Sequence, residues 1–177
     1  IPYHNAAKMT VDSGDFGTVF EKALEAGDVK GFSKRKEESK KRGRLRGLGV
    51  GSYMEVTAPP NKEMGGIRFE GGFEGDKRIT FITGTLDYGQ GHASPFAQVL
   101  VSRLGVPFES IHLKQSDSDE LVFGAGTGGS RSAMMSGSAA IQAADLVIKK
   151  GKDLAAEELE AAAADIEFRE GRFTVVG

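Results

Sequence analysis

The sequence predicts an α+β fold in which helices pack on a mixed β-sheet. Two strand-like runs, at residues 67–75 and 77–85, follow one another and predict a pair of strands. Beyond them, helix and strand patterns alternate along the chain. The two most glycine-rich loops, at 84–92 and 124–132, each lie just upstream of a predicted helix. A run of strands followed by alternation is typical of helices layered on a mixed sheet.

The 177 residues are expected to form a single partial domain, with a helical entry segment over 1–45 and the sheet over 46–177. Asp15 is suited to cap a helix that stops near Gly27, because apolar residues recur between them at helical spacing. A second helix is predicted over 30–44, and its run SKRKEESKKRGR resembles a nucleic-acid patch. The interleaved glutamates and the lack of aromatic stacking residues favour a solvated helix face instead.

The remaining strands are predicted from short apolar runs bounded by turn residues. Residues 47–58 indicate a strand whose glycines allow close packing. A turn is expected at 74–76, between the two paired strands. SIHLKQ, at 110–115, predicts a short strand, and the segment 166–176 predicts a hairpin that closes the chain.

Three further helices follow from the apolar pattern. Apolar residues on one face predict a helix over 95–104, which Gly105 ends. Residues 131–150 are apolar on most sides, which predicts a largely buried helix that ends at Gly151. The third helix is expected over 153–164, with an aspartate as its cap.

Composition excludes several function classes. The net charge is −2, which gives no general field for nucleic acid or an anionic membrane. The sequence has no cysteine, which excludes disulfides, thiolate metal sites and iron–sulfur ligation within this chain. No apolar run approaches the roughly 18 residues of a spanning helix and no signal peptide is visible, so we expect a cytoplasmic protein without a membrane span. Glycine is the anomaly, because its 25 residues are about twice the usual share of ~7%.

The two glycine loops are the candidate binding site. The first contains Gly89, Gln90 and Gly91, and the second, GAGTGGSRS, offers hydroxyl and guanidinium groups. N–H groups at helix starts attract anions, and glycine lets a phosphate or a flat ring approach the backbone. Arg131 adds a planar fork that fits phosphate oxygens with two bonds. Together the loops predict a site for a large, phosphate-bearing ligand; the alternative is two tight turns with Arg131 on the surface.

Other motifs in these loops carry less chemistry. Gly124, Gly126 and Gly129 match G-x-G-x-x-G, but an acidic loop precedes them, which disfavours a dinucleotide fold. A P-loop fails because Ser130 stands where a lysine is required. His92 is a candidate general base or metal ligand, although a loop histidine that binds the backbone is favoured. The aspartates of the acidic loop are candidates for a cation, although loop carboxylates more often are solvated or cap turns.

Beyond these local arguments, two segments resemble a known family when read in order. GQGHASPFAQVLVSRLGVPFESIHL followed by GAGTGGSRS resembles the molybdenum-binding large subunit of the xanthine dehydrogenase/aldehyde oxidase family, which includes bacterial carbon monoxide dehydrogenase. VDSGDF, followed by GFSKRKEESKKRGRLRGLG, resembles the opening of that family's second molybdopterin-binding domain. Ser94, the run SDSD and Val122 depart from the family's usual residues. The resemblance covers essentially the whole chain and implies that it is the front part of that domain.

The resemblance also implies a cofactor and its contacts. In that family the cofactor is molybdopterin with molybdenum, commonly as the cytosine dinucleotide in bacterial members, and Arg131 favours this longer form. Iron–sulfur and flavin (FAD) groups lie on other subunits or domains, so the remaining part of the large subunit and these subunits are expected partners. The expected cofactor-binding residues are Gly89, Gln90, Gly91, Thr127, Gly128, Gly129, Ser130, Arg131 and Ser132.

The implied function is that of a molybdenum hydroxylase, which oxidises a C–H bond of an aldehyde, purine or N-heterocycle, or carbon monoxide, with water-derived oxygen. The family's catalytic glutamate lies in a Gly-Glu-Gly setting that this sequence lacks. We therefore assign no catalytic residue and no metal ligand to this chain, and expect it to be inactive alone. The alternatives are a non-catalytic nucleotide-binding or regulatory module, and an interaction domain whose glycine loops are only turns.

Overall fold

The computed structural model describes residues 1–6, 8–54, 57, 62–71 and 78–176. Contacts along the chain divide it into two units, Ile1–Met54 and Glu55–Gly177. The first unit thus extends beyond residue 45, where the sequence patterns place the end of the entry segment. Each unit is described by itself.

The N-terminal unit contains two short strands and two helices. The strands β1 (Tyr3–His4) and β2 (Thr10–Val11) pair antiparallel. Helix α1 spans Phe16–Ala26, and the side chain of Asp15 accepts a hydrogen bond from the N–H of Thr18 at 3.2 Å. The predicted helix cap is therefore confirmed. Helix α2 spans Phe32–Lys41, within the helix predicted over 30–44.

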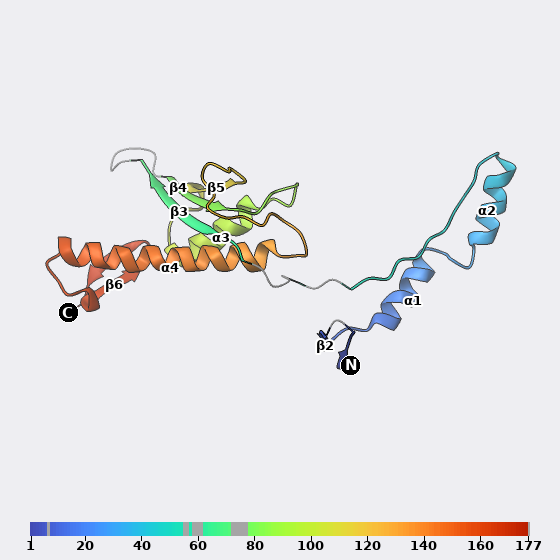
Figure 1. Ribbon diagram of the computed structural model, residues 1–177, viewed down its shortest axis with the longest axis horizontal. Coiled ribbons are helices and arrows are strands. Elements are labelled where there is room, and N and C mark those ends of the chain that lie inside the picture. The colour runs from blue at the N-terminus through green and yellow to red at the C-terminus, as the bar shows by residue number, and fades with distance from the viewer. Residues whose placement is uncertain (7, 55–56, 58–61, 72–77, 177) are drawn as a thin grey trace. The chain divides into compact units, whose positions relative to one another are not determined.

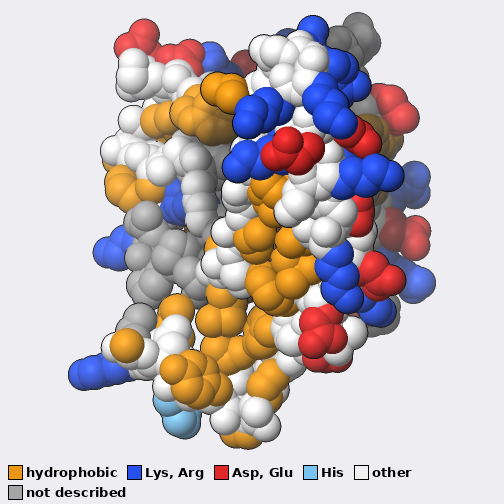
Figure 2. All heavy atoms as spheres, turned by 90° about the vertical axis from the view of Figure 1, so that its right-hand side faces the viewer, with side chains coloured by type: hydrophobic (Ala, Val, Ile, Leu, Met, Phe, Trp, Pro, Cys, Tyr) orange, Lys and Arg blue, Asp and Glu red, His pale blue; other side chains and the backbone are white. Residues whose placement is uncertain are grey.

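The surface of this unit leaves apolar side chains uncovered. None of the residues of α1 is buried, and Phe16 and Val19 are 52% and 65% exposed. Figure 2 shows a face of the molecule on which lysine and arginine side chains lie among acidic ones, beside a band of hydrophobic side chains. The strand predicted over 47–58 is absent from residues 47–54, while residues 55, 56 and 58 lie outside the described part of the chain.

The second unit is built on a three-stranded sheet of β3 (Gly65–Glu70), β4 (Arg78–Thr83) and β5 (Ile111–Gln115). Strand β4 lies in the centre, antiparallel to β3 and parallel to β5. Its residues from Ile79 to Thr83 are all buried, as expected of a central strand. The predicted mixed sheet is therefore confirmed, while the turn expected at 74–76 lies outside the described residues.

Two helices pack on this sheet and form the core with it. Helix α3 (Ala93–Leu104) connects β4 to β5 through the short helix η1 (Phe108–Ser110), and the long helix α4 (Ser132–Glu158) follows β5. Figure 1 shows α4 running beneath the strands. The helices and the sheet confirm the α+β fold. The central buried cluster comprises Phe81, Phe96, Leu100, Leu104, Ala140 and Ala144.

The end of α3 is defined by Gly105, as predicted. Its φ of +64° is left-handed, and its N–H donates to the carbonyl of Val101 at 2.8 Å. A Cβ at this position would lie 2.4 Å from the Cα of Glu170, in the turn between β6 (Ile166–Arg169) and β7 (Arg172–Val175). The closing hairpin follows the short helix η2 (Ala163–Asp165) and confirms the prediction for 166–176.

The predicted end of the long helix at Gly151 is wrong. Helix α4 continues through Gly151 to Glu158, so the separate helix expected over 153–164 is also wrong. A Cβ at Gly151 would lie 2.2 Å from Cζ of Phe173, on the closing hairpin. Glycine at 151 makes room for this ring against the helix, and packing outweighs its weak helix propensity. Within the described part of the chain, no helix has the length and apolarity needed to span a membrane.

The core predicts a sharp contrast between two leucines. Leu100 is fully buried on α3, whereas Leu146 on α4 is 60% exposed. We expect Leu100→Ala to lower the free energy of unfolding by about 2–5 kcal/mol, because it leaves a cavity. Leu146→Ala, the matched control, should change it by less than about 0.5 kcal/mol. Urea denaturation measures both, and equal losses would contradict the assigned core.

Candidate functional site

The two glycine loops emerge at the same edge of the sheet. Residues 84–92 follow β4 directly, and 124–132 follow β5 after the acidic turn that begins at Ser116. Because β4 and β5 are parallel neighbours, their carboxyl ends lie side by side. This is the edge at which open sheets with parallel strands commonly bind ligands. No strand leads directly into Gly124, so the dinucleotide-fold alternative lacks its required context.

Direct contacts join the loops. The N–H of Gly126 donates to the carbonyl of Gly84 at 3.2 Å, and the N–H of Leu86 donates to Oγ1 of Thr127 at 3.0 Å. A Cβ at Gly84 would lie 2.2 Å from the Cα of Gly124. The glycines at 84 and 124 therefore let the two backbones touch, and the loops form one structural unit.

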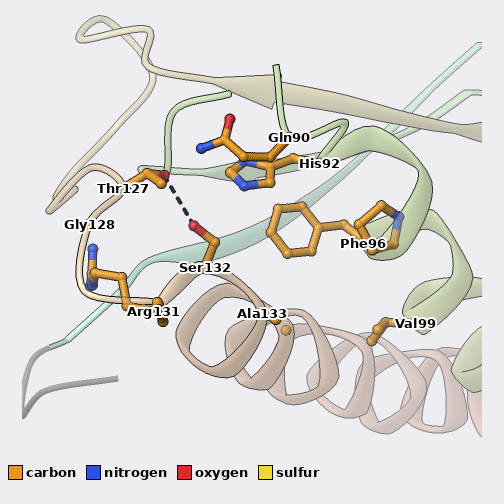
Figure 3. Close-up of a pocket in the computed structure, with 12 residues that line it drawn as sticks. Gln90, His92, Phe96, Val99, Thr127, Gly128, Arg131, Ser132 and Ala133 are labelled. Atoms are coloured by element: carbon orange, nitrogen blue, oxygen red, sulfur yellow. Dashed lines mark hydrogen bonds between the residues drawn. The ribbon is translucent and has the colours of Figure 1, made fainter. Parts of the chain in front are cut away.

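A cavity of about 510 Å³ lies between the loops and the helices that follow them. Figure 3 shows Gln90 and His92 from the first loop, Phe96 and Val99 from α3, and Thr127 and Arg131 from the second loop around it. Of the predicted cofactor-binding residues, the structure brings Gln90, Thr127, Gly128, Ser130, Arg131 and Ser132 together at this cavity. It does not place Gly89, Gly91 or Gly129 in the cavity wall.

The Gly-Gln-Gly turn is organised by Asp87. Oδ1 of Asp87 accepts hydrogen bonds from the N–H groups of Gly89 at 2.7 Å and Gly91 at 3.2 Å. Its Oδ2 accepts from the N–H of His92 at 2.6 Å. The bond from His92, followed by that from Gly89, lowers the pKa of Asp87 below its usual value. In this structure these N–H groups bind a carboxylate of the chain itself.

This arrangement gives Gly89 and Gly91 a structural role within the turn itself. Gly89 and Gly91 have φ values of +109° and +73°, which turn their N–H groups toward Asp87. Neither would bring an added Cβ within 4 Å of another described residue. The left-handed backbone therefore requires these glycines. Sequence reasoning missed Asp87, although an aspartate commonly bonds the N–H two residues later.

The side chain of Arg131 is buried and paired. Its Nη1 donates to Oε2 of Glu63 at 2.9 Å and to the carbonyl of Gly126 at 2.7 Å, and its Nη2 donates to the carbonyl of Lys62 at 2.8 Å. The side chains of Arg131 and Glu63 are 4% and 0% exposed. The alternative of a surface arginine is therefore wrong.

Three of the five N–H groups of the Arg131 fork thus bind the protein, two from Nη1 and one from Nη2. Among the described residues, Nε of Arg131 has no hydrogen-bond partner. Arg131 thus joins the second loop to the segment before β3. The sequence gives no local signal for Glu63, which lies 68 residues away.

His92 is part of a buried polar chain. It is 5% exposed and packs against the ring of Phe96, and its Nδ1 lies 3.1 Å from Nε2 of Gln115. Gln115 in turn donates to Oγ1 of Thr85 at 2.7 Å. The side-chain partner of His92 is therefore Gln115. No group of three histidine or acidic residues suited to a metal ion occurs in the part of the chain that the structure describes.

Asp117 of the acidic loop fits its structural alternative. A carboxylate oxygen of Asp117 lies 3.0 Å from Nζ of Lys114, and its other oxygen accepts from the N–H of Asp119 at 3.0 Å. The bond from Lys114, followed by that from Asp119, lowers the pKa of Asp117. This carboxylate caps a turn and pairs with a lysine.

The buried pair makes a prediction about stability. Glu63→Gln keeps the shape of the side chain but leaves the guanidinium of Arg131 buried without its counter-charge. We expect it to lower the free energy of unfolding by on the order of 3 kcal/mol. Asp145→Asn is the matched control, because the Arg103–Asp145 pair is 51% and 45% exposed; it should cost at most about 1 kcal/mol. Chemical denaturation measures the free energy of unfolding of both variants. Equal losses in the two variants would contradict the prediction that burial makes the Glu63–Arg131 pair the more important one.

Comparison with protein families matches residues 22–177 to the molybdopterin cofactor-binding domain. The chain is 31% identical over 188 residues to the carbon monoxide dehydrogenase large chain of Hydrogenophaga pseudoflava. It is 36% identical over 179 residues to the 6-hydroxypseudooxynicotine dehydrogenase complex subunit gamma of Paenarthrobacter nicotinovorans. Both alignments cover 99% of this chain but only 23% and 21% of the respective relatives.

Solved structures agree with these relatives. The structure of a Cu,Mo-CO dehydrogenase in its carbon monoxide reduced state matches with a TM-score of 0.64 and 29% identity, over 99% of this chain and 24% of that one. Quinoline 2-oxidoreductase from Pseudomonas putida 86 matches with a TM-score of 0.56 and 27% identity, over 98% and 23%. The chain therefore belongs to the molybdopterin cofactor-binding domain family found in the large subunits of molybdenum hydroxylases.

Proposed function

We propose that this chain supplies one wall of the molybdenum-cofactor site in an enzyme that oxidises a C–H bond, or carbon monoxide, with water-derived oxygen. The observation that carries the proposal is the cavity at which both predicted cofactor loops meet. The chain spans less than a quarter of the length of the relatives named above, so the proposal assigns the activity to the complete enzyme and not to this chain alone.

The residues at the cavity fit such a cofactor. Oγ1 of Thr127 lies 3.1 Å from Oγ of Ser132, so one wall carries paired hydroxyls, while Phe96 and Val99 form an apolar side. A flat ring system can pack its face on the apolar side of the cavity. Acceptor atoms along the edge of the ring can then bind the hydroxyl groups of the other wall. An added Cβ at Gly126 or Gly128 would meet no described atom within 4 Å, which leaves the loop surface open to a ring. When bound, the cofactor supplies the redox chemistry.

In this proposal the chain binds and orients the cofactor. The amide of Gln90 and the hydroxyls of Thr127 and Ser132 provide hydrogen bonds at the cavity, and Phe96 and Val99 exclude water from one side. We assign general acid or base catalysis to residues outside this chain. The related proteins are named for substrates as different as carbon monoxide and quinoline, yet they resemble this chain to similar degrees. Selection of the substrate is therefore proposed to lie elsewhere in the enzyme.

Further parts of the proposal rest on the family resemblance. They are the cytosine dinucleotide form of the cofactor, the iron–sulfur and flavin subunits as partners, and a cytoplasmic location. Arg131 lines the cavity, and three of its five N–H groups bind the protein.

Elemental analysis of the native, full-length protein that carries this chain tests the proposal. We expect molybdenum in stoichiometric amount, together with a molybdopterin released on denaturation. A full-length protein isolated without molybdenum but with a bound nucleotide would support the nucleotide-binding alternative. The 177-residue chain alone is expected to show no turnover with aldehydes, purines or carbon monoxide.

Gln90→Glu tests the contact with the cofactor. Oε1 of Gln90 accepts a hydrogen bond from the N–H of Tyr88, and a glutamate keeps this acceptor. It loses the NH2 donor and places a negative charge at the cavity. We expect kcat of the complete enzyme to fall by about tenfold or more, because losing the bond from Gln90 leaves an acceptor on the bound cofactor unsatisfied, at a cost of roughly 1–3 kcal/mol.

Molybdenum content should be partly retained and the melting temperature little changed in this variant. Gln142→Glu, at an exposed position of α4, is the matched control and should leave kcat unchanged. Steady-state kinetics and elemental analysis of both variants give the answer. Wild-type kcat in Gln90→Glu would remove Gln90 from the site.

A further inference from the structure

The first cofactor loop holds its own anion. Both carboxylate oxygens of Asp87 accept hydrogen bonds. The donors are the N–H groups of Gly89, Gly91 and His92. Backbone N–H groups that converge in this way form a concave anion site, which in other proteins receives a phosphate. In this chain the anion in the site is the carboxylate of Asp87, two residues before Gly89.

The same turn fixes the orientation of Gln90. Because an N–H group can only donate, the bond from the N–H of Tyr88 identifies the side-chain oxygen of Gln90 as its acceptor. The NH2 group of the amide is then the end that remains to donate. Gln90 lines the cavity, and Figure 3 shows its amide above His92. The Asp87 bonds hold the residues on both sides of Gln90, so they determine where this amide lies.

We propose that Asp87 is a positioning residue, whose carboxylate fills the anion site of the turn and so presents the NH2 group of Gln90 to the cofactor. The proposal rests on the function proposed above. It also defines the ligand chemistry at this end of the cavity. A negative charge at Asp87 disfavours a phosphate beside the turn, so the atom that Gln90 meets is an acceptor on the ring portion of the ligand.

Asp87→Ala in the 177-residue chain tests the turn without any cofactor. We expect amide hydrogen exchange at Gly89, Gly91 and His92 to accelerate by about tenfold or more, as expected for lost charge-assisted bonds. NMR relaxation of the side-chain 15N of Gln90 should show that the amide loses its fixed orientation.

Asp117→Ala is the matched control, because Asp117 also caps a turn by accepting a backbone N–H, away from the cavity residues. It should change neither the exchange nor the relaxation of the Gly-Gln-Gly turn. Acetate supplies the missing carboxylate, so adding it to Asp87→Ala should restore both signals. Unchanged exchange and relaxation in Asp87→Ala would overturn the proposal.

The complete enzyme tests the connection to the cofactor. In Asp87→Ala we expect kcat to fall by about tenfold, as for loss of one hydrogen bond, with KM for the substrate nearly unchanged and partial recovery in acetate. Wild-type kcat and molybdenum content, together with a disordered Gln90 amide, would overturn the proposal. If the wild-type enzyme contains no molybdenum, the proposed function fails, and the NMR measurements alone decide whether Asp87 positions Gln90.

Discussion

The parallel pairing of β4 with β5 is the constraint on which the rest of this unit depends. Parallel neighbours end at the same edge, and the two loops that leave them are separated by helix α3 in the sequence yet touch in space. Without this pairing, Gly84 and Gly124 would not meet, and the cavity would have only one wall. The helix required to connect two parallel strands also supplies the apolar side of the cavity through Phe96.

Three different physical reasons explain glycines at described positions of this chain, and none of the three concerns ligand access. At positions 89, 91 and 105 the backbone is left-handed. At 84 and 124 two backbones approach too closely for a side chain. At 151 a phenyl ring occupies the space of the absent Cβ. Composition alone shows the excess of glycine, but only the surroundings of each position show which role it has.

Sequence reasoning predicted the features that depend on neighbouring residues. The Asp15 cap, the Gly105 helix end, the central strand β4 and the closing hairpin all follow from local pattern. Sequence reasoning failed for features that depend on contacts between residues far apart in the chain. Phe173 occupies the space beside Gly151 where α4 continues, and Glu63 forms a buried ion pair with Arg131 from 68 residues away. The cavity residues could be grouped beforehand because they lie in two continuous loops, whereas Asp87 was missed because its partners were expected to bind something else.

The buried pair between Glu63 and Arg131 has a consequence for which substitutions this domain tolerates. Arginine uses two terminal nitrogens here for three separate acceptors, and the single ammonium of a lysine cannot reproduce that geometry. A change at either position alone leaves a charge in the interior, while a coordinated change to two apolar side chains removes both charges together. A substitution at one of the two positions is therefore expected to be tolerated better when the other changes with it.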